Sequence, residues 1–364
     1  MKTSLYIGRP FGIKVTVHWT FFILIAYVVY INLRNGSSIA EIFESVFFVL
    51  TIFGCVILHE LGHSLAARRY GIITRGITLL PIGGVASLTK IPEEPQKELF
   101  VAIAGPLINL TIALILFIIL LLGGFDFSLL LSFQYLNRAA FLPALMIVNM
   151  MLFLFNLVPA FPMDGGRLLR AGLGFRFSRL QATRVAARIG QLFAIFFAIW
   201  GLFNNPFLIL IAVFVFLGAQ AELQDVQSKS MLEGKRINDL LMRNFTPLNP
   251  GMPLKQVIDI LLNGREEEFI ILDDNKVVGV LTKNLIIKGL SEYGEDVEVD
   301  RIMDRDFPLF TIDETVKEVY EKLQLSGTKI APVFDDDLLI GVIDIKNIHE
   351  YLLVFEALNR KKWF

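Results

Sequence analysis

The sequence predicts a polytopic α-helical membrane domain followed by a water-soluble α/β domain. Of the 364 residues, 54% are hydrophobic, and the mean hydropathy is +0.60, whereas soluble domains have roughly 45–50% apolar residues. The long apolar runs lie within residues 1–225, and residues 226–364 have an ordinary soluble composition. We therefore expect a membrane domain over 1–225, a linker over 226–236 and a soluble domain over 237–364. The formal net charge of −1 does not point to nucleic acid, and no such partner is expected.

Six segments are apolar enough to be candidate transmembrane helices. A helix needs about 20 apolar residues to cross a bilayer. The last two candidates are short, and Asn204-Asn205-Pro206 between them predicts a tight turn. The six segments cover about residues 17–33, 42–66, 98–122, 138–158, 187–203 and 206–221.

The distribution of basic residues predicts the orientation of these spans. Lys and Arg are frequent at the N-terminus, after the second span and after the fourth span, whereas the intervening loops carry only Arg34 and Arg138. Basic loops face the cytoplasm. Both termini, and with them the soluble domain, are therefore expected on the cytoplasmic side.

Two stretches of the membrane domain do not have a helical pattern. Residues 72–90 are β-prone and contain the breaker pair Gly83-Gly84, and residues 156–166 cannot continue a helix past Pro159 and Pro162. Irregular backbone at membrane depth must be buried in protein or line a water-filled cavity. Both stretches therefore point to a functional site.

Candidate catalytic residues occur at the end of the second span, in His59-Glu60-Leu61-Gly62-His63. Residues i and i+4 share a helix face, so both imidazoles can reach one ion. Catalytic zinc takes three protein ligands and one water, whose pKa it lowers to about 7. Glu60 would accept a proton from this water and pass it to the leaving amine. A chance pairing of histidines is the weaker interpretation, because ionisable residues in an apolar span are usually functional.

The third metal ligand is expected to be Asp164. It follows the fourth span, stands between Pro162 and Gly165-Gly166, and lies on the same side of the membrane as His63 in the predicted topology. A carboxylate is a normal zinc ligand, and two imidazoles with one carboxylate suit zinc well. The alternative is an Asp-Gly turn residue without a metal role.

These two separated motifs resemble the site-2 protease family of intramembrane metalloproteases (peptidase M50). The first motif is 59–63, and the second, over 156–165, reads Asn-x-x-Pro-x-x-Pro-x-Asp-Gly. Ala104-Gly105-Pro106 with Asn109 also resembles a family element, as does Gly83-Gly84, which would lie in a re-entrant β loop near the active site. The resemblance covers the whole predicted membrane domain. Members of this type have six spans and a C-terminal tandem CBS (cystathionine-β-synthase-type) domain, as in the sporulation-factor processing protease of spore-forming bacteria.

The resemblance implies a zinc metalloendopeptidase, with His59, His63 and Asp164 as ligands of one zinc ion and Glu60 as the catalytic base. It implies hydrolysis of peptide bonds in or near transmembrane segments, with single-span or pro-form membrane proteins as substrates and a membrane protein as an inhibitor. It also implies a multi-pass protein of a prokaryotic cell membrane.

Three further residues are expected to contact the substrate: Asn156, Gly83 and Gly84. Asn156 would contact the substrate backbone or the oxyanion of the tetrahedral intermediate, and the alternative is a hydrogen bond in helix packing. A helical substrate must unwind before it is cut. An exposed strand edge within residues 76–88 could pair with the unwound segment by β-addition.

The soluble domain contains an internal repeat over about 237–290 and 298–353. Residues 269–282 parallel 330–344, and each half reads helix, strand, strand, helix. This pattern resembles a tandem pair of CBS motifs, which often bind adenine nucleotides in their cleft.

The nucleotide signature of that family is not intact here. Its ribose site is a Thr or Ser followed three residues later by Asp, but Thr282 is followed by Leu285, and Asp344 by Asn347. Two roles stay open. One is ATP or AMP binding with Thr282 in the cleft, and the other is a dimerisation or docking module without a ligand, with a homodimer formed through the CBS motifs.

Two other functions are compatible with a membrane domain and a CBS pair. A CBS-regulated transporter would place ionisable residues in its spans as substrate sites, but it has no need for the 59–63 motif. A catalytically inactive membrane adaptor would be expected to lack some metal or base residues, and all are present here.

Overall fold

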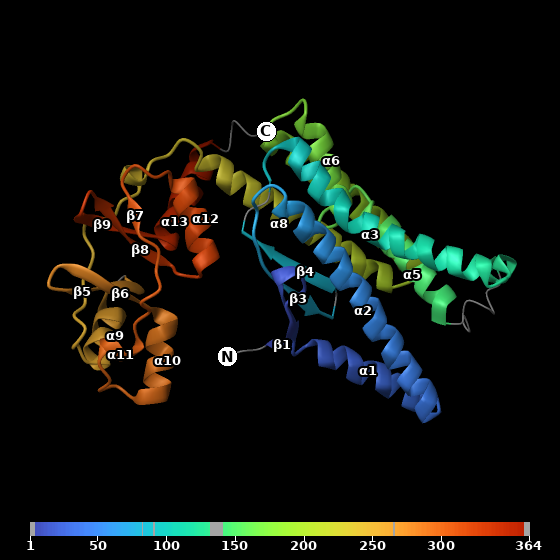
Figure 1. Cartoon of the computed structure of the whole chain (residues 1–364). Helices are drawn as coiled ribbons and strands as arrows, with labels where there is room; N and C mark the ends of the chain where they lie inside the picture. The colour runs from blue at the N-terminus through green and yellow to red at the C-terminus, as the bar shows by residue number, and fades with distance from the viewer. Residues whose placement is uncertain (1–3, 82, 90–91, 132–140, 265, 360–364) are drawn as a thin grey trace. The chain divides into compact units, whose positions relative to one another are not determined.

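The computed structural model describes residues 4–81, 83–89, 92–131, 141–264 and 266–359. The chain forms two compact units, Met1–Val226 and Gln227–Phe364, and each is described by itself. Figure 1 shows long helices with a small sheet in the first unit and short helices with short strands in the second.

Within the described part of the chain, four helices are long and apolar enough to cross a membrane: α2 (Ile39–Arg68), α3 (Pro95–Leu122), α7 (Arg179–Phe203) and α8 (Phe207–Met231). Two shorter apolar helices are α1 (Phe21–Arg34), with 14 residues, and α5 (Phe141–Asn156), with 16. Both are below the roughly 20 residues that a perpendicular span needs. Four of the six predicted spans thus correspond to helices of sufficient length and apolarity, and the number of six spans stays a prediction. The start of the predicted span 138–158 lies outside the described residues.

Local signals explain where two of the spanning helices begin. α2 follows a capping box in which Ser38 and Glu41 satisfy each other's backbone N–H groups, and Ser178 and Gln181 do the same before α7. The predicted turn at 204–206 separates α7 from α8. The motif 59–63 lies inside α2, which continues for five residues beyond it.

A four-stranded sheet joins the N-terminus to the β-prone stretch. Its order is β1-β2-β3-β4, with β2 and β3 parallel and the other pairs antiparallel; the bounds are β1 (Ser4–Gly8), β2 (Lys14–His18), β3 (Thr74–Leu80) and β4 (Gly83–Leu88). β4 is the last strand, so its outer edge has no strand partner within the described part of the chain. A re-entrant position of β3 and β4 in a membrane stays a prediction.

The predicted start of the first span, at residue 17, is wrong. Residues 14–18 form β2, and α1 begins at Phe21. The reason is an alternating pattern in which Val15 and Val17 are buried, at 2% and 6% exposed, while their neighbours are not, as in a half-buried strand. The short 3-10 helices of this unit are η1 (Pro10–Gly12) and η2 (Phe127–Leu131).

The predicted interruption after the fourth span is confirmed. α5 ends at Asn156, an irregular segment follows, and α6 (Asp164–Gly174) begins with the predicted ligand. Two glycines allow α6 to approach this segment closely. A Cβ at Gly165 would lie 2.1 Å from the Val158 carbonyl oxygen, and one at Gly166 would lie 2.7 Å from the Ala160 carbonyl carbon. Larger residues would push α6 away.

A buried ionic cluster ties α6 to α3 and α8, and α7 joins the cluster through Glu98. The guanidinium of Arg170, only 1% exposed, donates to Glu98 of α3 at 2.8 and 2.5 Å and to Glu222 of α8 at 2.5 Å. Arg179 of α7 reaches the second oxygen of Glu98 at 3.3 Å. Breaking such a buried pair usually costs about 3–5 kcal/mol, because one charge is left unpaired. The cluster therefore holds the helix that carries Asp164.

The second unit confirms the predicted order of helix, strand, strand, helix in each repeat. The first repeat has α9 (Leu254–Asn263), β5 (Glu268–Asp273), β6 (Lys276–Thr282) and α10 (Lys283–Tyr293); the second has α12 (Val316–Ser326), β8 (Ile330–Asp335), β9 (Leu338–Asp344) and α13 (Ile345–Asn359). Shorter elements are η3 (Ile237–Asp239), α11 (Val299–Ile302) and β7 (Phe310–Thr311), which pairs with β8 in parallel.

The strand registers correct the alignment of the two repeats by one residue at the first strand. Thr282 pairs with Glu268, and Asp344 pairs with Ile330. Glu268, and not Phe269, is therefore equivalent to Ile330. The sequence alignment missed this because both hairpins have a two-residue turn, and the apolar strands look alike when shifted by one residue.

Candidate metal centre

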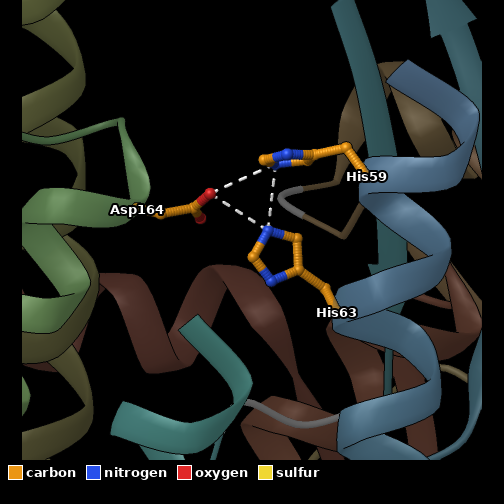
Figure 2. A group of neighbouring side chains, drawn as sticks. All are labelled: His59, His63 and Asp164. Atoms are coloured by element: carbon orange, nitrogen blue, oxygen red, sulfur yellow. Dashed lines mark hydrogen bonds and ion pairs between the residues drawn. The ribbon is translucent and has the colours of Figure 1, made fainter. Parts of the chain in front are cut away.

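Three ligand atoms from two distant parts of the chain converge at one point (Figure 2). His59 Nε2 and His63 Nε2 on α2 lie 3.1 Å apart, and Asp164 Oδ2 on α6 lies 3.2 and 3.0 Å from them. All three residues are at most 8% exposed. Tetrahedral ligands at 2.0–2.1 Å from zinc are roughly 3.3 Å apart. The spacing therefore fits three ligands of one zinc ion.

The outer nitrogens of both imidazoles are held by acceptors on α3. His59 Nδ1 donates to the side-chain oxygen of Asn109 at 2.6 Å, and His63 Nδ1 donates to the carbonyl oxygen of Val101 at 2.8 Å. In a neutral imidazole the other nitrogen, Nε2, then presents a lone pair. Three lone pairs at about 3 Å repel one another unless a cation lies between them. This arrangement is the strongest structural indication of a metal site.

The face of α3 that contacts these imidazoles carries a buried asparagine and a glycine, which allow close packing. Asn109 donates in turn to Asn149 of α5 at 3.1 Å, and both asparagines are fully buried. A Cβ at Gly105 would lie 2.2 Å from His63 Nε2, so only glycine leaves room for the ring. Asn109 and the carbonyl of Val101 were not predicted as partners of the histidines. The available signal was the spacing of residues 101, 105 and 109, which share one face of a helix.

A cavity of about 750 Å³ opens on this centre. It is lined by all the residues that the sequence predicted as metal ligands, base or substrate contacts in the membrane domain: His59, Glu60, His63, Gly83, Gly84, Asn156 and Asp164. Apolar side chains form much of the remaining wall, among them Val56, Leu152, Phe155 and Phe214. The cavity is thus lined by both ionisable and apolar side chains.

The other predicted contacts have specific surroundings. A Cβ at Gly84 would lie 2.8 Å from Cγ of Glu60, so β4 passes directly over the predicted base. Asn156 donates from Nδ2 to the carbonyl oxygen of Leu152 within its own helix, at 2.9 Å. Arg167, which the sequence analysis did not single out, also lines the cavity. The sequence signal for it was its position three residues after Asp164, because residues i and i+3 lie on the same face of a helix.

Thr282 lies in the second unit, away from these residues in the chain. Its hydroxyl caps α10 by accepting from the N–H of Leu285 at 3.4 Å, and the carboxylate of Asp344 accepts from the N–H of Asn347 at 2.6 Å in the equivalent place. Both side chains therefore act as helix N-caps, and a nucleotide contact of Thr282 stays a prediction.

Known proteins resemble this chain in both of its parts. Residues 47–199 match Peptidase family M50, and residues 237–292 and 299–354 match the CBS domain. A zinc metalloprotease of Methanocaldococcus jannaschii is 32% identical over 363 residues, which cover 100% of both chains. Stage IV sporulation protein FB of Bacillus subtilis is 29% identical over 164 residues, covering 44% of this chain and 53% of that protein.

Among solved structures, the site-2 protease from Methanocaldococcus jannaschii is 38% identical, with a TM-score of 0.45, over 60% of this chain and 95% of that chain. The full-length match to the archaeal zinc metalloprotease is what decides membership. This chain therefore belongs to peptidase family M50, the site-2 protease family, and carries a tandem pair of CBS domains after its membrane domain.

Proposed function

We propose that this protein is a zinc-dependent endopeptidase that cuts membrane-protein substrates in or near their transmembrane segments. The observation that supports this most directly is the convergence of the ligand atoms of His59, His63 and Asp164 in a cavity that also contains Glu60. When bound, one zinc ion per chain would supply an activated water and polarise the scissile carbonyl.

Different residues would orient the metal ligands, bind the metal and transfer the proton during hydrolysis. Asn109 and the Val101 carbonyl orient the two imidazoles, and Asp164 completes the ligand set. Glu60 would accept a proton from the attacking water and deliver it to the nitrogen of the leaving amine. The hydroxyl of the water adds to the carbonyl carbon, and the C–N bond breaks. Gln in place of Glu60 could not carry this proton.

The walls of the cavity suit an apolar peptide segment. Leu152, Phe155 and Phe214 line the same cavity as the proposed metal ligands. α2, which carries two of those ligands, is long and apolar enough to cross a membrane. Peptide hydrolysis needs water, which the bilayer core lacks. A polar cavity within an apolar helical unit provides the place where an apolar substrate and water can meet.

The free edge of β4 is suited to bind an unwound substrate segment. β4 is the last strand of its sheet, and Gly83, Gly84 and Val85 line the cavity beside Glu60. An extended peptide added to this edge would replace its lost helical hydrogen bonds with bonds to the strand. The scissile bond would then pass over the base.

Single proline substitutions at Val85 and Ala86 test this binding mode. Neighbouring N–H groups of a strand point to opposite edges, so one substitution removes a donor from the free edge and the other removes a bond to β3. We expect the substitution that removes the free-edge donor to lower cleavage about twofold to tenfold, the effect of losing one hydrogen bond. Its zinc content should stay at the wild-type level. Unchanged cleavage in both variants that still fold would contradict the proposal.

The site of cleavage tests the proposed function itself. In detergent micelles, the protein is expected to cut a model single-span substrate inside its apolar segment or within about one helical turn of it, as mapped by mass spectrometry of the products. A soluble peptide with only the flanking sequence is the control and should be a poor substrate. Cleavage confined to the soluble flank would contradict an intramembrane function.

We also propose a multi-pass protein of a prokaryotic cell membrane, with both termini in the cytoplasm. The alternating distribution of Lys and Arg between the apolar segments supports this orientation. Single-span or pro-form membrane proteins are the proposed substrates, and an inhibitory membrane protein is a further proposed partner. Family membership does not support a transporter, and the complete set of ligands and base does not support an inactive adaptor.

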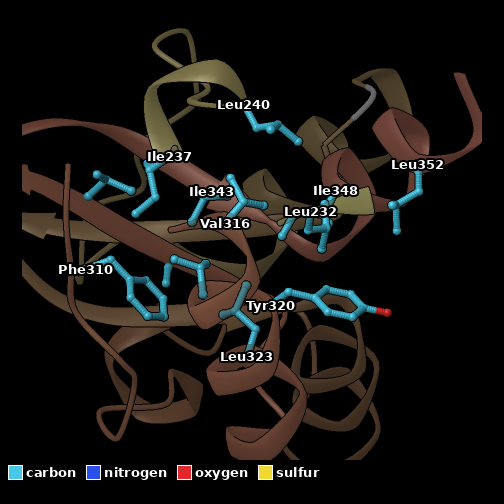
Figure 3. Packing of buried hydrophobic residues seen from close by; sticks show 13 residues of the cluster. Leu232, Ile237, Leu240, Phe310, Val316, Tyr320, Leu323, Ile343, Ile348 and Leu352 are labelled. Carbon is cyan, nitrogen blue, oxygen red and sulfur yellow. The ribbon is translucent and has the colours of Figure 1, made fainter. Parts of the chain in front are cut away.

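The CBS pair is proposed to regulate the protease, and the end of α8 supports this. Leu232 follows α8 directly, and together with Ile237 and Leu240 it packs into a core built mainly from the second repeat (Figure 3). A change in that core would therefore act on the end of α8. Two triggers remain proposals: ATP or AMP in the cleft near Thr282, and formation of a homodimer.

A further inference from the structure

Two arginines on α6 differ in their ion pairing. Arg170 is fully buried and donates to two carboxylates. Arg167, one turn earlier, is partly buried and lines the cavity of the metal centre. It stands three residues after Asp164, so both side chains project from the same side of the helix. Contacts at Gly165 and Gly166 and the pairs of Arg170 hold this helix in place.

The guanidinium of Arg167 has no hydrogen-bond or ion-pair partner among the described residues. Arg keeps its charge at any ordinary pH and carries five N–H donors. A partly buried charge in an apolar helical unit lowers stability unless it is paired. The charge of Arg167 acts on the nearby carboxylates of Glu222, Asp164 and Glu60 without forming an ion pair, whereas Arg170 is fully paired. Among the described residues, the five N–H donors of Arg167 are therefore left for an anion that binds in the cavity.

The charges of the cavity show which kind of anion fits. Glu60 and Asp164 contribute two negative charges, which the charge of one zinc ion would balance. Arg167 then leaves the lining with one net positive charge. A peptide bond is neutral before attack, and negative charge develops on its carbonyl oxygen when water adds. A fixed cation therefore stabilises the transition state more than the bound substrate.

We propose that Arg167 is a catalytic residue whose guanidinium donates to the carbonyl oxygen of the scissile peptide as that oxygen becomes negative. This rests on the proposed function. Arg167 keeps its own protons throughout, while Glu60 moves the proton of the attacking water to the leaving amine. Asn156 was the earlier candidate for this contact, but one of its two amide hydrogens is already used by Leu152.

Two substitutions and one control test the role of Arg167. In Arg167→Gln, kcat is expected to fall by about 100-fold to 1000-fold, the effect of removing one oxyanion donor, while KM changes by less than about threefold, because the interaction is absent from the ground state. Arg167→Lys should recover part of the loss, because it keeps the charge and loses the fork of donors. Arg176→Gln removes the same charge from an exposed position outside the cavity and should cut normally.

Zinc affinity gives a readout that is independent of activity. Removing a positive charge near a cation site should leave the zinc Kd unchanged or make it lower, as measured by competition with a chelator. A structural role of Arg167 predicts weaker zinc binding and a lower Tm in Arg167→Gln, and either result would overturn the proposal.

A higher KM with unchanged kcat would also overturn it, because Arg167 would then bind a permanent carboxylate of the substrate. Failure of the proposed function is distinguishable from these outcomes. In that case the wild type cuts no single-span substrate, whichever residue occupies position 167.

Discussion

Replacing Glu60 with Gln is expected to lower kcat by about 10²- to 10⁴-fold, the usual contribution of a general acid–base. Glu60 lines the cavity beside the two histidines but is not one of the three converging ligands. The carboxamide of Gln has nearly the same shape and cannot accept the proton. Zinc content should therefore stay at the wild-type level, and single-turnover cleavage in detergent measures the loss.

A control on the same helix separates this effect from a general disturbance of α2. Glu44→Gln changes an exposed glutamate of α2 that does not line the cavity, and it should cut at the wild-type rate. If Glu60→Gln loses zinc together with activity, Glu60 is part of the metal site, and its assignment as a base is wrong. If Glu60→Gln still cuts, another residue carries the proton.

Asp164→Ala is expected to weaken zinc binding by about 100-fold or more. Structural zinc sites with four ligands bind with roughly 10–16 kcal/mol, so one ligand corresponds to about 3 kcal/mol. Asp164 also begins α6, but losing an acidic residue at a helix start costs only about 0.3–1 kcal/mol. The protein should therefore stay folded while its zinc Kd rises and its cleavage is lost.

Competition with a chelator measures this Kd, and thermal unfolding of the metal-free protein checks the fold. Asp164→Asn keeps the shape but provides a weaker ligand, so an intermediate Kd is expected. A wild-type Kd in Asp164→Ala would show that the carboxylate is not a ligand. The Asp-Gly turn interpretation would then replace it.

The three residues that converge in the candidate metal centre could be predicted because the signals for them are local. His59 and His63 need only the i, i+4 spacing of a helix, and Asp164 was identified by the prolines and glycines around it. The partners that orient the histidines could not be predicted in this way. Asn109 reaches His59 only because α3 packs along α2, and no local pattern specifies which face of a uniformly apolar helix meets its neighbour.

The N-terminal sheet was missed for a similar reason. Residues 4–18 form two short strands directly before an apolar helix, so the apolar run hides the boundary. β2 also pairs in parallel with β3, about sixty residues later, and such a pairing has no local turn signal. The β-prone stretch was recognised, but the sheet that it completes was not.

The two arginines of α6 show the limit most clearly. Both belong to the run Arg167-Leu168-Leu169-Arg170 and are equivalent in sequence. Only the fold brings Glu98 and Glu222, from helices far away in the chain, to Arg170 and leaves Arg167 facing the cavity. The different surroundings of the two arginines depend on tertiary contacts alone.

The most direct test of the central claim is to measure zinc content and cleavage on the same purified wild-type sample, before and after chelation. The account predicts about one zinc per chain, cleavage of a single-span substrate that disappears when a chelator removes the metal, and recovery when zinc is added back. Cleavage that continues at the same rate in the metal-free protein, or a wild-type chain that binds no zinc, would contradict it.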